Sequence, residues 1–199
     1  LPPFALFDPA LGLTSVIPDM DPTRPAQADP RKLIDAIQRF GVTQMFGSPA
    51  LLDTLSRYGI AHGVQLKTLC RVMSAGAPVP PAVVERMQAM LPEDANIYTP
   101  YGATECLPVA IIEGRELQTT RAATEAGAGT CIGRPVAPNV VRLIHISDKP
   151  IAEWRDELLV ADGDVGELVV AGPSVTDEYI ARPKATAQAK IRETLPDGS

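Results

Sequence analysis

Histidine and cysteine are scarce in this sequence. Its 199 residues include two histidines, His62 and His145, and three cysteines, Cys70, Cys106 and Cys131. The cysteines are odd in number and have no Cys-x-x-Cys spacing, and the histidines lie far apart, so neither a disulfide framework nor a zinc site is indicated. Because disulfide scaffolds belong to oxidising compartments, we expect a reducing, cytoplasmic location.

Long apolar runs and an excess of basic residues are also missing. No stretch approaches the roughly 18 consecutive apolar residues of a membrane-spanning helix, and no secretory signal opens the sequence. The net charge of −6 opposes binding to nucleic acid or anionic lipid. With 45% hydrophobic residues the chain can bury a core. We therefore expect a soluble globular protein with no transmembrane segment and no nucleic-acid partner.

Hydrophobic periodicity predicts alternating helices and strands in the first half of the chain. Asp29 and Pro30 open a helix that Gly41 closes. The predicted helices cover residues 29–40, 48–59 and 82–91, and the predicted strands cover residues 42–46, 71–74 and 96–99. This order implies parallel strands joined by helical crossovers.

The pattern changes after Ile112. Strand-like runs cover residues 140–146, 158–160 and 167–170, with a Gly-Asp-Val-Gly turn at 163–166, and a last helix is predicted over 183–193. Residues 114–133 show no periodicity and are predicted to form a long surface loop. We expect an α/β fold with a parallel-sheet αβα layer in residues 1–112 and a β-rich subdomain in residues 113–199.

The two ends of the sequence suggest a piece of a longer protein. The chain begins without Met inside an apolar segment, residues 1–6, and stops at Pro196-Asp197-Gly198-Ser199. Such turn residues normally lead into another strand.

One short segment combines several groups that suit a nucleotide. Tyr101-Gly102-Ala103-Thr104-Glu105 follows a predicted strand, where ligands bind in open α/β sheets. Tyr101 offers a flat face to a purine, and Gly102 permits close backbone approach. Thr104 offers a hydroxyl to a phosphate and Glu105 a hard oxygen to Mg²⁺. The alternative is a solvated strand-to-loop turn with an exposed carboxylate.

A second segment, Ser74-Ala75-Gly76-Ala77-Pro78-Val79-Pro80, also follows a predicted strand. Its small residues would leave a slot open for a flat ring. The alternative is a tight strand-to-helix turn in which Pro80 and Pro81 stiffen the start of the helix.

Four segments together resemble a known superfamily. SAGAPVPPAVVERM, YTPYGATE, GRPVAPN and GDVGELVVAGPSVTDEYIARPKAT occur in the order seen in the adenylate-forming superfamily of acyl-CoA synthetases, peptide-synthetase adenylation domains and luciferases. The resemblance implies that Gly76, Ala77 and Pro78 lie along adenine and that Tyr101 lies against its ring. It also implies that Thr104 contacts the α-phosphate and Glu105 the metal, with Gly102 and Ala103 in the same nucleotide-binding segment.

A narrower resemblance concerns the substrate. LPPFALFDPALGLTSVIPDMDPTRP and TPYGATECLPVA are similar to the olefin-biosynthesis members, which resemble fatty-acyl-CoA ligases and are thought to close β-hydroxy acids into β-lactones. The resemblance implies ATP, Mg²⁺ and a long-chain carboxylic acid, with either a CoA thioester or a β-lactone as product. Where the family commonly has Pro-Leu-Phe-His, this chain has Phe4-Ala5-Leu6-Phe7 without a histidine, which weakens the case for CoA ligation.

The resemblance also implies that several catalytic parts lie outside this chain. The family's phosphate loop, ribose-binding Asp, hinge and carboxy-terminal domain with its catalytic Lys have no counterpart in the 199 residues, so the chain alone is expected to be inactive. The rival hypothesis is a non-catalytic binding or scaffolding domain that keeps the fold. The presence of Thr104 and Glu105 argues against it, because packing alone requires neither.

Two further features resemble functional sites but are interpreted as having no role in binding or catalysis. Residues 127–133 contain a Gly-x-Gly pattern, but the last glycine is one residue late for a dinucleotide site and no convincing strand precedes it, so a flexible loop is predicted. Cys106 stands beside Glu105, whose charge would raise a thiol pKa, so a nucleophilic role is not favoured.

Overall fold

The computed structural model of the protein describes residues 2–194; the turn predicted at 196–199 lies outside the described residues. The helices are α1 (Pro2–Ala10), α2 (Pro30–Phe40), α3 (Pro49–Ala61), α4 (Pro81–Met90), α5 (Gly114–Thr119), α6 (Arg121–Ala123) and α7 (Pro183–Ala189). The strands are β1 (Gln44–Phe46), β2 (Arg71–Met73), β3 (Asn96–Ala103), β4 (Cys106–Glu113), β5 (Arg134–Pro135), β6 (Val140–Ile144) and β7 (Glu167–Ala171). Within residues 2–194, none of the helices has the length and apolar character needed to cross a bilayer.

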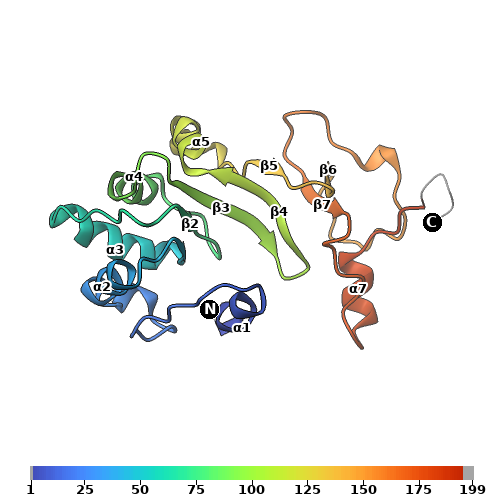
Figure 1. Cartoon of the computed structure of the whole chain (residues 1–199). Coiled ribbons are helices and arrows are strands. Elements are labelled where there is room, and N and C mark those ends of the chain that lie inside the picture. The colour runs from blue at the N-terminus through green and yellow to red at the C-terminus, as the bar shows by residue number, and fades with distance from the viewer. Residues whose placement is uncertain (1, 195–199) are drawn as a thin grey trace. The chain divides into compact units, whose positions relative to one another are not determined.

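The larger sheet contains five strands in the order β1-β2-β3-β4-β5. Strands β2 to β5 are labelled in Figure 1. β1 and β2 run parallel to each other, and so do β2 and β3, with Phe46 opposite Met73 and Met73 opposite Tyr98. β3 and β4 are joined by only two residues, Thr104 and Glu105, and a connection this short is possible only between antiparallel strands. The predicted α/β class with a mainly parallel sheet is confirmed.

Local sequence signals place the first helices correctly. The Asp29 carboxylate accepts a hydrogen bond from the backbone N–H of Arg31 at 2.9 Å at the start of α2, and Gly41 ends that helix with φ of +59°. The Ser48 hydroxyl caps α3 by accepting from the N–H of Leu51 at 3.3 Å. The predicted helices of the first half are therefore confirmed.

Helix α3 continues two residues past its predicted end at Gly59. A Cβ atom at Gly59 would lie 2.1 Å from Cε of Met90, so the glycine lets α3 approach α4 closely instead of ending the helix. A glycine is therefore an ambiguous signal for a helix end, because close packing can require it as well as a turn.

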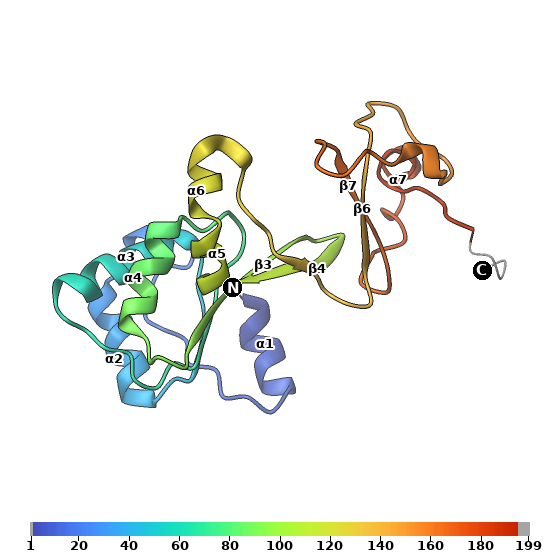
Figure 2. The ribbon, with the colours of Figure 1, turned by 90° about the horizontal axis from the view of Figure 1, so that it is seen from above.

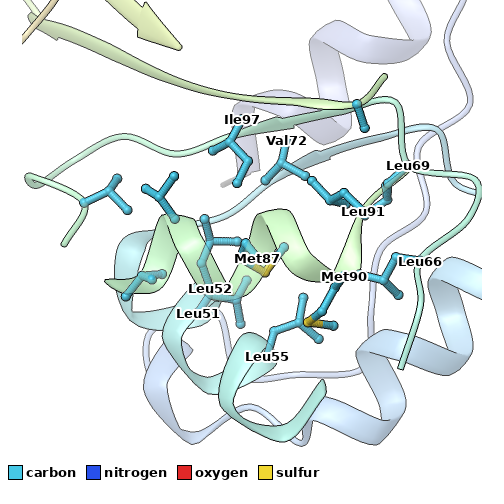
Figure 3. Packing of buried hydrophobic residues seen from close by; sticks show 14 of the residues in the cluster. Leu51, Leu52, Leu55, Leu66, Leu69, Val72, Met87, Met90, Leu91 and Ile97 are labelled. Atoms are coloured by element: carbon cyan, nitrogen blue, oxygen red, sulfur yellow. The ribbon is translucent and has the colours of Figure 1, made fainter. Parts of the chain in front are cut away.

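The core lies between these helices and the parallel strands. Figure 3 shows Leu55 of α3 and Met87 and Met90 of α4 packed together, with Val72 of β2 and Ile97 of β3 facing them. All five side chains are fully buried. Burial of each such side chain contributes about 1.5–3 kcal/mol relative to exposure. The core thus fixes β2 and β3, the two strands that lead into the predicted nucleotide segments.

Contacts between Cα atoms divide the chain into two compact units. The first contains Leu1–Tyr101 and Ile111–Arg134, and the second contains Gly102–Ala110 and Pro135–Ser199. The subdomains predicted from the sequence, 1–112 and 113–199, are successive stretches, whereas each compact unit joins two separate stretches.

The surface loop predicted over residues 114–133 is wrong in its first part. Helices α5 and α6 and a π-helical turn at Thr124–Ala128 occupy residues 114–128, and α5 packs against α4 (Figure 2). Leu117 is buried, and a Cβ atom at Gly114 would lie 2.8 Å from Cγ1 of Val84. Packing against α4 therefore stabilises helices too short to show a period in the sequence.

In the second unit, β6 and β7 form an antiparallel pair with Val140 opposite Ala171 and Ile144 opposite Glu167. Both strands were predicted, although β6 ends at Ile144 and not at residue 146. The predicted strand at 158–160 is reduced to a single antiparallel bridge between Leu159 and Ile144, which follows a 3₁₀ turn at Asp156–Leu158.

The last helix is shorter than predicted. α7 ends at Ala189 and not at residue 193, because the following residues are extended. The N–H of Arg192 donates to the carbonyl of Ala152 at 3.1 Å, and the N–H of Trp154 donates to the carbonyl of Arg192 at 2.8 Å. Backbone pairing with residues 152–154 thus replaces the last turn of the predicted helix.

Candidate nucleotide and metal site

The loop after β2 has an unusual backbone at Gly76. Its φ is +93°, a conformation that side chains disfavour, and a Cβ atom there would have nothing within 4 Å. Gly76, Ala77 and Pro78 are exposed, whereas the next residue, Val79, is buried. The loop is therefore anchored by the core after Pro78 and presents its small residues to the outside.

The Tyr101-Gly102-Ala103-Thr104-Glu105 segment differs from its predicted position. It was expected to follow a strand that ends at Thr99, but β3 continues to Ala103. Tyr101, Gly102 and Ala103 are strand residues, and Thr104 and Glu105 form the turn of a hairpin. The sequence did not reveal this hairpin because β4, its second strand, was not predicted.

Gly102 permits the close pairing at the end of this hairpin. A Cβ atom at Gly102 would lie 2.7 Å from the carbonyl oxygen of Cys106. Cys106 itself is buried, so its thiol is not presented to a substrate. The structure thus gives this glycine a role in strand pairing, and the ligand approach that the sequence suggested stays a prediction.

The register of the sheet brings the start of the segment at residues 74–80 beside β3. The N–H of Ser74 donates to the carbonyl of Tyr98 at 3.0 Å. The last residue of β2, Met73, therefore lies opposite Tyr98 of β3, and Tyr101 follows three residues later on β3. Tyr101 is 42% exposed. A flat ligand would therefore find small residues and an accessible aromatic ring at the carboxyl ends of adjacent strands.

Glu105 has a specific partner that sequence reasoning missed. The hydroxyl of Tyr179 donates a hydrogen bond to Oε1 of Glu105 at 2.7 Å. This bond lowers the pKa of Glu105, and the residue's own backbone N–H and the positive charge of Lys190 act in the same direction. Glu105 is half-buried and ionised at neutral pH, whereas Thr104 is exposed.

The segment that carries Tyr179 is attached to the hairpin turn. We call residues 175–179 the strap. The N–H of Thr176 donates to the carbonyl of Glu105 at 2.8 Å, and Val175 forms an antiparallel bridge with Cys106. The only sequence signal for this contact is that Tyr179 belongs to the last of the four resembling segments, since 74 positions separate it from Glu105.

The donor set around Glu105 fits a metal that is shared with a nucleotide. Among residues 2–194 no three His, Cys, Asp or Glu side chains are grouped so as to hold a metal ion. Mg²⁺ in nucleotide enzymes keeps several waters and binds one or two carboxylates together with substrate phosphates. Glu105 can provide one such carboxylate, and phosphates and water would complete the coordination.

Comparison with known proteins identifies the family to which the chain belongs. Residues 9–180 match the family of AMP-binding enzymes, and the chain belongs to that family. It is 69% identical over 198 residues to the olefin beta-lactone synthetase of Stenotrophomonas maltophilia and 65% identical over 199 residues to that of Xanthomonas campestris. Both alignments cover 100% of this chain but 35% of the relative, so the chain spans about a third of the length of these curated relatives.

A solved structure supports the fold. The amide bond synthetase of Marinactinospora thermotolerans has a TM-score of 0.63 to this structure at 24% identity, over 86% of this chain and 30% of the other.

Proposed function

We propose that this chain is part of an ATP-dependent enzyme that activates a long-chain β-hydroxy acid as an acyl-adenylate and closes it to a β-lactone. The observation that carries the proposal is Glu105, an ionised carboxylate held by Tyr179 and adjacent to Thr104 at a hairpin turn. The identity to two olefin beta-lactone synthetases supports the choice of product. We infer a cytoplasmic location because all three cysteines are free, whereas disulfide scaffolds belong to oxidising compartments.

In the first step the substrate carboxylate attacks the α-phosphorus of ATP. A bond from the carboxylate oxygen to phosphorus forms, and the bond to the pyrophosphate oxygen breaks. Gly76, Ala77, Pro78 and Tyr101 bind adenine and so orient the nucleotide for this attack. The Thr104 hydroxyl donates to an α-phosphate oxygen, where negative charge accumulates.

Glu105 holds the metal in this scheme. Bound Mg²⁺ supplies neutralisation of phosphate charge. Glu105 contributes an ionised carboxylate in a fixed position, which binds the cation without having to be reoriented.

The second step decides the product. The β-hydroxyl oxygen of the substrate attacks the acyl carbon, its proton is released, and AMP leaves with the bonding electrons to give a four-membered lactone. Attack by the thiol of CoA at the same carbon would instead give a thioester. The adenylate is common to both routes, so the residues described here serve either one.

Product analysis of the full-length protein tests the proposal. With ATP, Mg²⁺ and a long-chain β-hydroxy acid, mass spectrometry should detect AMP, pyrophosphate and the lactone without CoA. The corresponding acid without the hydroxyl is the control, and it should support pyrophosphate exchange but yield no lactone. A thioester with CoA and no lactone with or without CoA would exclude the lactone step, and absence of exchange would favour the scaffold hypothesis.

A substitution at Gly76 tests the adenine contact. Gly76→Ala should weaken ATP binding several-fold. A side chain at this positive φ would cost about 1–3 kcal/mol of backbone strain, and the loop would shift to relieve it. Gly63→Ala is the matched control, since Gly63 also has positive φ, +63°, and open space around a Cβ atom. Calorimetric titration with ATP should show the loss only for Gly76→Ala, and equal losses would refute the adenine assignment.

A further inference from the structure

The Tyr179 hydrogen bond engages one part of the Glu105 carboxylate. An ionised carboxylate has about four lone-pair directions; the O–H of Tyr179, 2.7 Å from Oε1, uses one of them and the backbone N–H of Glu105 another. Acceptor capacity for a cation therefore remains. A hydroxyl donor also restricts rotation of the carboxylate, which as a ligand on a hairpin turn would otherwise sample several rotamers.

We propose that Tyr179 is a positioning residue that fixes the Glu105 carboxylate in the orientation in which it meets a nucleotide-bound divalent cation. The proposal rests on the function proposed above, in which Glu105 holds the metal. Tyr179 itself does not touch the reacting atoms, so its effect on catalysis passes through Glu105.

The strap is built so that the phenol keeps its place. The N–H of Tyr179 donates to the hydroxyl oxygen of Thr186 on α7 at 3.0 Å. At the other end of the strap, the N–H of Thr176 is bonded to Glu105 and the amine of Lys190 donates to the carbonyl and hydroxyl oxygens of Thr176. Hydrogen bonds thus hold the backbone at both ends of the strap, which fixes the point from which the Tyr179 side chain reaches Glu105.

Charge around Glu105 agrees with a positioning role. The Lys190 amine is the cationic group that lowers the pKa of Glu105, and it is already engaged by Thr176. Tyr179 is neutral, and its own pKa is raised by the bond to Glu105. The hydroxyl that donates to the Glu105 side chain thus belongs to a neutral residue and brings no positive charge to the carboxylate.

Metal binding measured without turnover shows whether Tyr179 positions the Glu105 carboxylate or only stabilises the fold. Mn²⁺ replaces Mg²⁺ as a paramagnetic probe, and its free concentration is followed by electron paramagnetic resonance with the full-length protein and a non-hydrolysable ATP analogue. Tyr179→Phe should weaken Mn²⁺ binding roughly tenfold or more, as is typical when a partner of a metal ligand is lost. Glu105→Gln should weaken it further, and adding Tyr179→Phe to Glu105→Gln should cause no additional loss.

Tyr58→Phe is the matched control for the loss of a tyrosine hydroxyl. Tyr58 lies on α3 in the first unit, where its ring stacks on His62 at 3.9 Å, and phenylalanine preserves that stacking. This variant should bind Mn²⁺ as the wild type does. A Tyr179→Phe variant with unchanged Mn²⁺ affinity and a lower unfolding midpoint would overturn the proposal. The bond between Tyr179 and Glu105 would then only stabilise the fold.

The two proposals fail in different ways. If Glu105→Gln binds Mn²⁺ like the wild type, the metal assignment of Glu105 is wrong and the proposed function loses its main support. If Glu105→Gln weakens binding but Tyr179→Phe does not, the metal assignment stands and only the positioning role of Tyr179 is rejected.

Discussion

Glu105→Gln in the full-length protein is expected to leave the fold intact and to remove most of the adenylation activity. Glutamine has nearly the same shape, and its amide oxygen can still accept the hydrogen bond of Tyr179. A neutral amide is a poorer ligand than a carboxylate for a hard cation. Loss of several kcal/mol of metal-dependent charge stabilisation corresponds to a rate roughly 100-fold lower or more.

Pyrophosphate exchange at limiting Mg²⁺ measures this effect, and circular dichroism checks the fold. Glu178→Gln is the matched control, because it removes the same charge from the exposed residue next to Tyr179. It should exchange pyrophosphate at nearly the wild-type rate. Near-normal turnover of Glu105→Gln at limiting Mg²⁺ would show that another group binds the metal.

Gly133→Ala is expected to cause the largest loss of stability. Gly133 has φ of +84°, and a Cβ atom there would lie 2.1 Å from the carbonyl oxygen of Ile111 and 2.7 Å from Cβ of Ile112. Ile112 is buried, so neither neighbour can move without disturbing β4. Backbone strain and overpacking together should lower the free energy of unfolding by roughly 2–6 kcal/mol.

Gly163→Ala separates the two contributions to that loss. Gly163 has a similar φ of +91°, but nothing lies within 4 Å of a Cβ atom there. Its substitution should cost only the backbone strain, about 1–3 kcal/mol. Urea denaturation midpoints, together with soluble yield, should rank wild type above Gly163→Ala and Gly163→Ala above Gly133→Ala. Equal midpoints for the two variants would contradict the close approach of Gly133 to β4.

Features with local causes could be predicted from the sequence. The caps at Asp29 and Ser48 and the buried face of α4 depend on residues within one or two helical turns of each other. The parallel start of the sheet followed from the order of these elements. The same reasoning placed residues 74–80 and 101–105 after predicted strands, although residues 101–103 belong to β3 itself, and the ligand contacts of both segments remain predictions.

Features with distant causes could not be predicted. Strand β4 has buried residues in no regular alternation, so its pairing with β3 was not visible in the pattern. Helix α5 is held by Leu117 packing against residues about 30 positions earlier, and six residues are too few to show a helical period. The bond between Tyr179 and Glu105 has no local signature because its partners meet only in the folded chain.

The long separation of those two partners has a consequence for how the site is made. On the ribosome, the hairpin turn with Glu105 emerges 74 residues ahead of Tyr179. A nascent chain that has already folded α2, α3 and α4 onto β1, β2 and β3 therefore carries Glu105 without the donor that orients it and lowers its pKa. Contacts of such long range form late because the loop between them must first close. The segments at residues 74–80 and 101–103 can thus acquire their backbone early in synthesis, and the carboxylate gains its Tyr179 bond only after the strap and α7 have been made.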